Sequence, residues 1–274
     1  MNFTKYTLSL FVLAALLDGS FVRAESLGGK NSSPKVEVGV AVATQYLADY
    51  RGSGEYQSQF LPVPILLYNG DRFRIDRSGI HSDIFKRPRV ELNISGEASL
   101  SGGEDNDLRA GMPELQSAFE IGPSLNVRLL GDSFEDGLSL RLPVRAVLAL
   151  GSNGGEAIGY LANPKLTYRN HNVGNNWRFT SNLGFTAASG DYHQYYYSVE
   201  QQYETSTRAS YDARAGFSGW YSKAGVSRRR GSWFVSASLR YDNLNGANFK
   251  DSPLVETDNY FSVSLAVAKF LWSK

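Results

Sequence analysis

The chain has 274 residues, no cysteine, and 28 basic against 27 acidic side chains. This balance argues against a nucleic-acid-binding protein, which normally carries a basic excess. The absence of cysteine excludes disulfide scaffolds, thiolate metal sites and thiol catalysis. Aromatic residues make up 13% of the chain and 27 residues are glycine, a composition that favours β-structure with many turns.

The N-terminus has the three-part layout of a secretory signal peptide. Lys5 precedes an apolar run over residues 6–17, and Val22-Arg23-Ala24 places small or apolar residues where signal peptidase reads them. The run is too short for a membrane-spanning helix, which needs about 20 apolar residues. A buried N-terminal helix is the alternative. We therefore expect residues 1–24 to be a signal peptide, and residues 25–274 to be one β-barrel domain beyond the inner membrane.

Apolar and polar residues alternate from residue 36 onward, which is the signature of β-strands because successive side chains point to opposite faces. The clearest runs are 36–43, 89–100, 119–129, 138–148 and 232–242. Strands in soluble proteins average about 5 to 6 residues, whereas a tilted strand needs about 9 to 11 to cross a bilayer. We therefore predict an all-β fold, a transmembrane antiparallel up-and-down β-barrel in the outer membrane of a Gram-negative bacterium. A periplasmic sandwich or lipocalin-like barrel, with its apolar face inward, is the alternative.

The connections between these runs differ in length. Long polar ones lie at 48–58, 101–112, 190–214 and 245–258, and short ones lie at 69–71, 86–88, 131–137, 171–176 and 228–231. Outer-membrane barrels alternate long extracellular loops with short periplasmic turns. The alternation holds if residues 71–86 form a hairpin that turns at Arg77-Ser78-Gly79. This gives 12 strands with both ends in the periplasm, and 10 strands is the fallback.

Two features fit the barrel less well. Prolines inside the expected strands each remove a donor from the ladder, and they are Pro62, Pro64, Pro123, Pro143 and Pro164. We expect bulges or a local gap there, above all around Pro62 and Pro64. The chain also ends on Ser273 and Lys274, although many such barrels end on an aromatic residue.

The sequence holds few candidates for chemistry. Its three histidines, His81, His171 and His193, show no spacing typical of a zinc site. Asp191 and His193 lie two residues apart in a long connection, and we interpret them as either a catalytic pair at the barrel rim or part of a solvated loop. The tyrosine-rich run 192–197 is either a sugar-binding platform or an interfacial aromatic cluster. We predict no enzyme activity, no cofactor and no metal site.

Charged residues suggest one partner-facing site. Arg228, Arg229 and Arg230 fall at a short turn that the topology places in the periplasm. They could dock an acidic protein or anionic murein groups, and the alternative is a basic turn beside lipid headgroups. Eight residues expected to face the lumen are mixed in sign and should pair across it: Glu91, Glu97, Glu120, Arg128, Arg141, Arg145, Lys165 and Arg178.

Several segments resemble the MltA-interacting protein family (MipA/OmpV) of outer-membrane proteins. They are Tyr50-Arg51-Gly52-Ser53-Gly54-Glu55-Tyr56, Leu61-Pro62-Val63-Pro64, Tyr68-Asn69-Gly70-Asp71-Arg72-Phe73, and Asp251-Ser252-Pro253-Leu254-Val255 followed by Asn259 and Phe261. The sequence departs from the family at Arg51, where proline is frequent, and at its non-aromatic last residue.

The resemblance implies a non-catalytic scaffold that tethers two enzymes at the inner leaflet of the outer membrane. One is a murein hydrolase of the lytic transglycosylase type, and the other is a murein synthase. Some family members are described as adhesins or solute-related barrels. We therefore keep two alternatives, a passive porin-like channel and a rim-located hydrolase. Outer-membrane lipid is the expected surrounding, and no nucleic-acid partner is expected.

Overall fold

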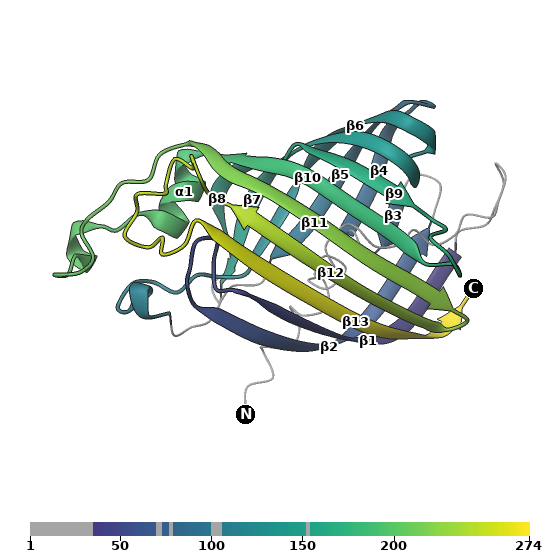
Figure 1. Ribbon diagram of the computed structural model, residues 1–274, viewed down its shortest axis with the longest axis horizontal. Coiled ribbons are helices and arrows are strands. Elements are labelled where there is room, and N and C mark those ends of the chain that lie inside the picture. The colour runs from purple at the N-terminus through teal and green to yellow at the C-terminus, as the bar shows by residue number, and fades with distance from the viewer. Residues whose placement is uncertain (1–34, 70–72, 77–78, 100–105, 152–153) are drawn as a thin grey trace.

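The protein is one antiparallel sheet of 13 strands with a short α-helix among its loops (Figure 1). The computed structural model describes residues 35–69, 73–76, 79–99, 106–151 and 154–274, so the expected signal peptide at 1–24 lies outside the described residues. The strands are β1 (Lys35–Ala48), β2 (Tyr56–Asn69), β3 (Phe73–Asp76), β4 (Gly79–Lys86), β5 (Val90–Ser99), β6 (Ala118–Ser133), β7 (Asp136–Gly151), β8 (Gly154–Ala162), β9 (Lys165–Asn170), β10 (Arg178–Ala188), β11 (Gly216–Arg230), β12 (Trp233–Asn243) and β13 (Asn259–Ser273). The helix is α1 (Gly190–Tyr197), and no helix of the described residues is long and apolar enough to cross a membrane.

The order of strand pairing is cyclic. Strands that follow one another in the chain pair from β1 to β8 and from β9 to β13, and β1 also pairs with β13. β8 and β9 form one traverse of the wall, because both pair with β7 on one side and β10 on the other, and only Asn163 and Pro164 separate them. With β8 and β9 counted as one, the 13 strands give twelve, the number that the sequence predicted, although β3 has only four residues. The break expected at Pro164 lies at this interruption.

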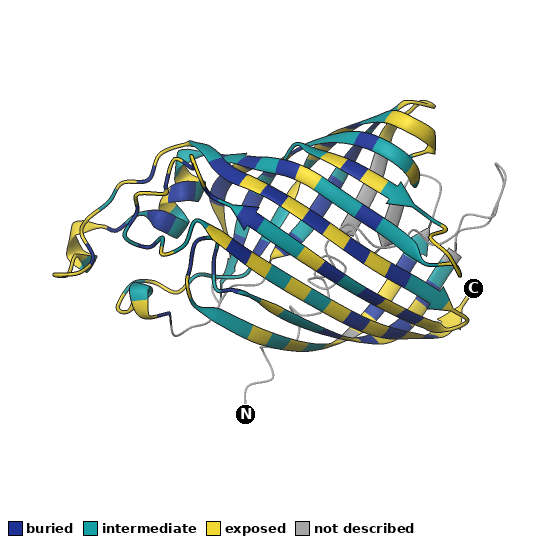
Figure 2. Ribbon diagram, in the orientation of Figure 1, coloured by how far each residue is buried: buried dark blue, intermediate teal, exposed yellow. Residues whose placement is uncertain are grey.

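The outward face is apolar, whereas the inward face carries many polar residues together with a smaller apolar cluster that includes Ile65, Leu67 and Phe234. Buried and exposed residues alternate along most of the long strands (Figure 2). On β1, the exposed residues Val38, Val40 and Val42 alternate with inward Glu37 and Ala41. The buried polar residues on the strands include Asn93, Ser95, Ser124, Asn126, Ser139, Thr167, Thr180, Ser227 and Asp242. A soluble barrel would turn its apolar face inward, so this distribution is that of a membrane barrel.

The pairing between neighbouring traverses of the wall is shortest between β2 and β3. β2 pairs with β1 over its whole length, from Tyr56 to Asn69. Among the described residues, its pairing with β3 is limited to Tyr68 and Asn69. The local gap expected around Pro62 and Pro64 is therefore confirmed. β3 ends at Asp76 and β4 begins at Gly79, so the expected turn at Arg77 and Ser78 lies outside the described residues.

The two ends of the barrel differ. Val36 and Lys274 exchange backbone hydrogen bonds of 2.9 Å. The start of β1 and the end of β13 therefore both lie at the end of the barrel that carries the short turns. We call this the turn end, and the opposite end, with the long connections, the loop end. Two connections on the loop-end side are short, because only two residues separate β3 from β4 and β7 from β8. The first belongs to the expected hairpin of residues 71–86, and the second is an exception to the expected alternation.

Candidate functional site

The long connections pack into a compact cap over the loop end. We call residues 49–55, 106–117, 189–215 and 244–258 the loop cap. Its buried apolar core joins three of these connections with the adjoining strand ends: Ala48, Tyr50, Tyr197, Val199, Ala213, Leu244, Ala247, Phe249, Leu254 and Tyr260. The fourth connection packs against this core through the partly buried Leu108, Met112 and Leu115. At its centre, the rings of Tyr197 and Phe249 stack 3.6 Å apart. These connections therefore form a folded layer with an interior of its own.

Hydrogen bonds between the loops reinforce this layer. Arg208 donates to the carbonyl oxygens of Leu108, at 2.6 Å, and Ala110, at 3.1 Å, which ties the connection after α1 to the one before β6. The Tyr50 hydroxyl donates to the carbonyl of Leu254 at 2.7 Å. Glu256 N–H donates to the carbonyl of Gly52 at 2.8 Å. Two segments that carry the family resemblance, about 200 residues apart in the chain, thus lie side by side.

His193 belongs to the cap and does not pair with Asp191. Its Nδ1 lies 2.5 Å from the carbonyl oxygen of Arg214, which can only accept, so Nδ1 carries the proton. Its Nε2 then accepts from the Ser218 hydroxyl at 2.6 Å. Asp191 is exposed, whereas His193 and Ser218 are fully buried. Burial lowers the pKa of His193, and the nearby Arg51 lowers it further. The helix turns His193 into the cap and leaves Asp191 outside, so the interpretation as a catalytic pair is wrong, and the alternative of a solvated loop holds for Asp191 only.

The tyrosine-rich run forms α1 and the start of the cap core. The Ser189 hydroxyl accepts from Tyr192 N–H at 3.4 Å and caps the helix. Burial raises the pKa of Tyr192 to about 12. Tyr197 is buried against Phe249. The interpretation as an interfacial cluster is therefore wrong, since Tyr197 packs inward against another loop. The interpretation as a binding platform stays a prediction, because Tyr192, Tyr196 and Tyr197 line a pocket in the lumen.

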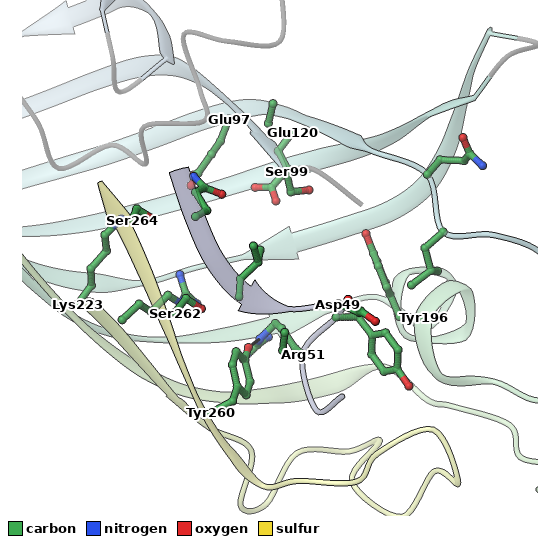
Figure 3. A pocket seen from close by; sticks show the side chains of 18 of the residues that line it. Asp49, Arg51, Glu97, Ser99, Glu120, Tyr196, Lys223, Tyr260, Ser262 and Ser264 are labelled. Atoms are coloured by element: carbon green, nitrogen blue, oxygen red, sulfur yellow. Dashed lines mark hydrogen bonds between the residues drawn. The ribbon is translucent and has the colours of Figure 1, made fainter. Parts of the chain in front are cut away.

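A polar pocket lies under the loop cap, in the part of the lumen nearest the loop end (Figure 3). Its volume is about 300 Å³. The strand residues that line it come from two groups, β5 and β6 on one side and the neighbouring strands β11, β12, β13 and β1 on the other. In the cyclic order of the wall these groups lie half-way round from each other. Tyr50, Tyr192, Tyr196 and Tyr197 of the cap line it as well.

One wall of this pocket is acidic. Glu97 of β5 and Glu120 of β6 stand directly opposite each other in the ladder, where two like charges are unfavourable alone. Arg145 of β7 lies between them, with Nη1 at 2.5 Å from a Glu97 oxygen and 3.1 Å from a Glu120 oxygen. The expected pairing of mixed charges across strands is confirmed for these three residues. We call them the acidic triad.

The opposite wall is basic. Arg240 of β12 donates two hydrogen bonds, of 2.6 and 2.9 Å, to the carboxylate of Asp242, which is fully buried. Arg51 reaches down from the cap, with Nη2 at 3.4 Å from the same carboxylate and Nε donating to the Tyr260 hydroxyl at 3.1 Å. We call Arg51, Arg240 and Asp242 the basic triad. Lys223 of β11 lines the pocket beside it.

Sequence reasoning placed Arg240 and Asp242 on the polar face of their strand but did not identify them as a site. Their spacing of two residues puts both on the inward face, which was the available signal. Arg51 appeared only as a departure from the family pattern. Its partner Asp242 is about 190 residues away in the chain, so nothing local could have joined them.

The arginines at the turn end divide into two roles. Arg229 points inward and forms two hydrogen bonds to Glu37, of 2.6 and 2.9 Å, and its guanidinium lies 4.3 Å from the ring centre of Phe270. Arg228 donates to the side-chain oxygen of Asn175 at 3.1 Å, and Arg230 is exposed. Among the described residues, no three histidine, aspartate or glutamate side chains are grouped as a metal site.

The chain is similar in fold to several solved structures: an outer-membrane channel from Pseudomonas putida F1 (12% identity, covering 92% of this chain and all of that one, TM-score 0.34), the toluene transporter TbuX from Ralstonia pickettii (12%, 88% and 74%, 0.26) and OccK11 (OpdR) from Pseudomonas aeruginosa (12%, 86% and 96%, 0.28). No curated protein matches the sequence.

The sequence model of one protein family, described as MltA-interacting protein MipA, matches residues 38–269. That stretch runs from the first strand into the last and covers most of the chain. The apolar outer face and polar lumen agree with the location expected from the sequence. The chain therefore belongs to the MipA family and is a β-barrel protein of the bacterial outer membrane.

Proposed function

We propose that the protein is a non-catalytic scaffold that holds a lytic transglycosylase, and with it a murein synthase, at the turn end of the barrel. The observation that carries this proposal is the match to a family described as MltA-interacting. In outer-membrane barrels the short turns face the periplasm, where murein lies.

The charges of the turn end support a role in docking. Arg228 and Arg230 lie at one turn, and Arg87 and Arg89 form a second basic turn between β4 and β5. Guanidinium groups bind carboxylates in fixed, two-bonded geometry, which suits them to acidic proteins and to murein peptides. Arg229 serves the barrel instead, because it is held by Glu37.

The test is chemical crosslinking in cells at native expression, followed by purification of the barrel and detection of the transglycosylase. We expect the wild-type chain to recover the enzyme. The double substitution Arg228→Glu with Arg230→Glu should lower recovery several-fold, since it reverses the charge of the turn. Lys250→Glu, an exposed charge in the loop cap, is the matched control and should recover the enzyme normally. Absence of the transglycosylase from the wild-type sample would overturn the proposal.

A passive solute channel is the second candidate, and the polar pocket in the lumen favours it. The packed loop cap speaks against free flow, because a solute would have to pass its apolar core. Planar-bilayer conductance separates the two functions. Steady conductance by the wild-type chain would support the channel, and a silent protein would rule out an open pore.

A further inference from the structure

The charges that line the pocket under the loop cap balance overall but are separated in space. Three carboxylates line it, from Asp49, Glu97 and Glu120, and three cations line it, from Arg51, Lys223 and Arg240. Glu97 and Glu120 lie on one side, and Lys223 lies with Arg51 on the other (Figure 3). A neutral pocket of this kind does not attract a simple anion or cation as a whole, but it has two poles.

The two poles differ in the kind of charged group that predominates. The acidic triad combines two carboxylates with one guanidinium. The basic triad combines two guanidiniums with one carboxylate. Charges held in a partly desolvated pocket act more strongly on a ligand than charges in open water.

We propose that this pocket is a binding site for a small zwitterion of the size of an amino acid or short peptide. Its ammonium group lies toward Glu97 and Glu120, and its carboxylate lies toward Arg51, Arg240 and Lys223. A ligand with one charge would satisfy one pole only and leave the other facing an apolar or neutral group. The volume of about 300 Å³ is at the small end of ligand pockets, which limits the ligand to this size.

The uncharged lining suits the middle of such a ligand. Ser238, Ser262 and Ser264 line the basic side, and their hydroxyls can donate to or accept from a peptide group. Tyr192 and Tyr196 close the pocket toward the cap and offer ring faces for small side chains. The site lies in the lumen and not at the turn end, so binding here does not depend on the scaffold function.

The first test uses ligands alone. The full chain in lipid nanodiscs is titrated by calorimetry with L-alanine, L-alanyl-L-alanine and tri-L-alanine, because the series samples different separations of the two charges. We expect saturable binding of at least one member. Acetylating its amine or amidating its carboxylate should each lower the affinity by about tenfold or more, as expected for the loss of a charged hydrogen-bonded group. Failure of all three to bind, or equal binding of the blocked forms, would overturn the proposal.

The second test uses variants of the walls. Glu97→Gln leaves Arg145 paired with Glu120, and Arg240→Gln leaves Arg51 beside Asp242, so each removes one charged group from its wall and leaves the remaining pair in place. Each should lower the affinity for the bound zwitterion about tenfold, while Arg228→Gln at the turn end should leave it unchanged. Heat-modifiable gel mobility reports that each variant is folded. Unchanged affinity in both folded wall variants would overturn the assignment of the two poles.

Discussion

The loop end and the turn end of this barrel are built on opposite principles. The long connections at the loop end bury an apolar core and bind one another through side chains such as Arg208 and Tyr50. The turn end has short connections, and charged residues such as Arg87, Arg89 and Arg230 are exposed there. The loop end is therefore held together by packing between its loops, whereas the turn end offers a pattern of exposed charge.

This difference separates two kinds of stability. The ladders between strands hold the barrel, and packing between loops holds the cap. A substitution in the cap should change access to the lumen and leave the barrel intact. A substitution at the turn end should act on the barrel itself or on a partner.

The largest effect is expected from Phe249→Ala in the cap. Phe249 is fully buried, stacks on Tyr197 at 3.6 Å and touches the His193 ring at 4.9 Å. Its truncation should destabilise the cap by about 3–5 kcal/mol. The measurement is limited proteolysis of the connection between α1 and β11, which should become several-fold faster. Heat-modifiable mobility should stay normal.

Phe261→Ala is the control for this change, because Phe261 is an aromatic residue of β13 that is 53% exposed on the outer face. It should leave proteolysis of the cap unchanged. If the Phe249→Ala cap resisted proteolysis as well as the wild-type cap, the stability of the cap would not depend on packing between its loops.

Arg229→Ala should give the next largest effect, this time on the barrel. It leaves the Glu37 carboxylate, whose side chain is 1% exposed, without the guanidinium that binds it. Removing one partner of a buried pair costs about 3 kcal/mol or more, and we expect the low end because Arg229 is partly exposed. Thermal unfolding in detergent measures it. Arg230→Ala, one residue further, should change stability by less than about 0.5 kcal/mol, and a similar loss in both variants would contradict the role given to Glu37.

A smaller effect should follow from pH. The pKa of His193 is lowered in the folded cap by burial, so the fold favours the neutral ring. Its contribution to stability is present above about pH 6.5, the ordinary histidine value, and is lost as the pH falls below it toward the folded pKa. Proteolysis of the cap should therefore be faster at pH 5 than at pH 7.5. In His193→Gln this difference should shrink, and a difference of the same size would assign the pH effect to another group.

The smallest effect is expected from Arg228→Ala. Arg228 makes one exposed hydrogen bond to Asn175 and lies 5.8 Å from the ring centre of Trp177. Such exposed contacts are worth less than about 1 kcal/mol. Thermal unfolding should barely change. A loss as large as that of Arg229→Ala would show that Arg228 also holds the barrel, and charge reversal there would then be a poor probe of docking.

Much of the wall could be read from the chain. The alternation of Val38, Val40 and Val42 with inward residues predicts a two-faced strand, and the prolines at 62 and 64 mark where pairing fails. These features are local, since the side-chain period and the missing proline donor act within a strand. The candidate site was harder to predict. The arginine turn was found, but its division into an inward Arg229 and two outer residues was not.

The sequence by itself determined that the chain forms long two-faced strands and how many there are, because a period of two and the spacing of turns are properties of neighbouring residues. Only the tertiary structure decided that the long connections close over the lumen, that His193 turns away from Asp191, and that two charged triads face each other. These depend on contacts such as Arg51 with Asp242, whose partners are brought together only when the ring of strands folds.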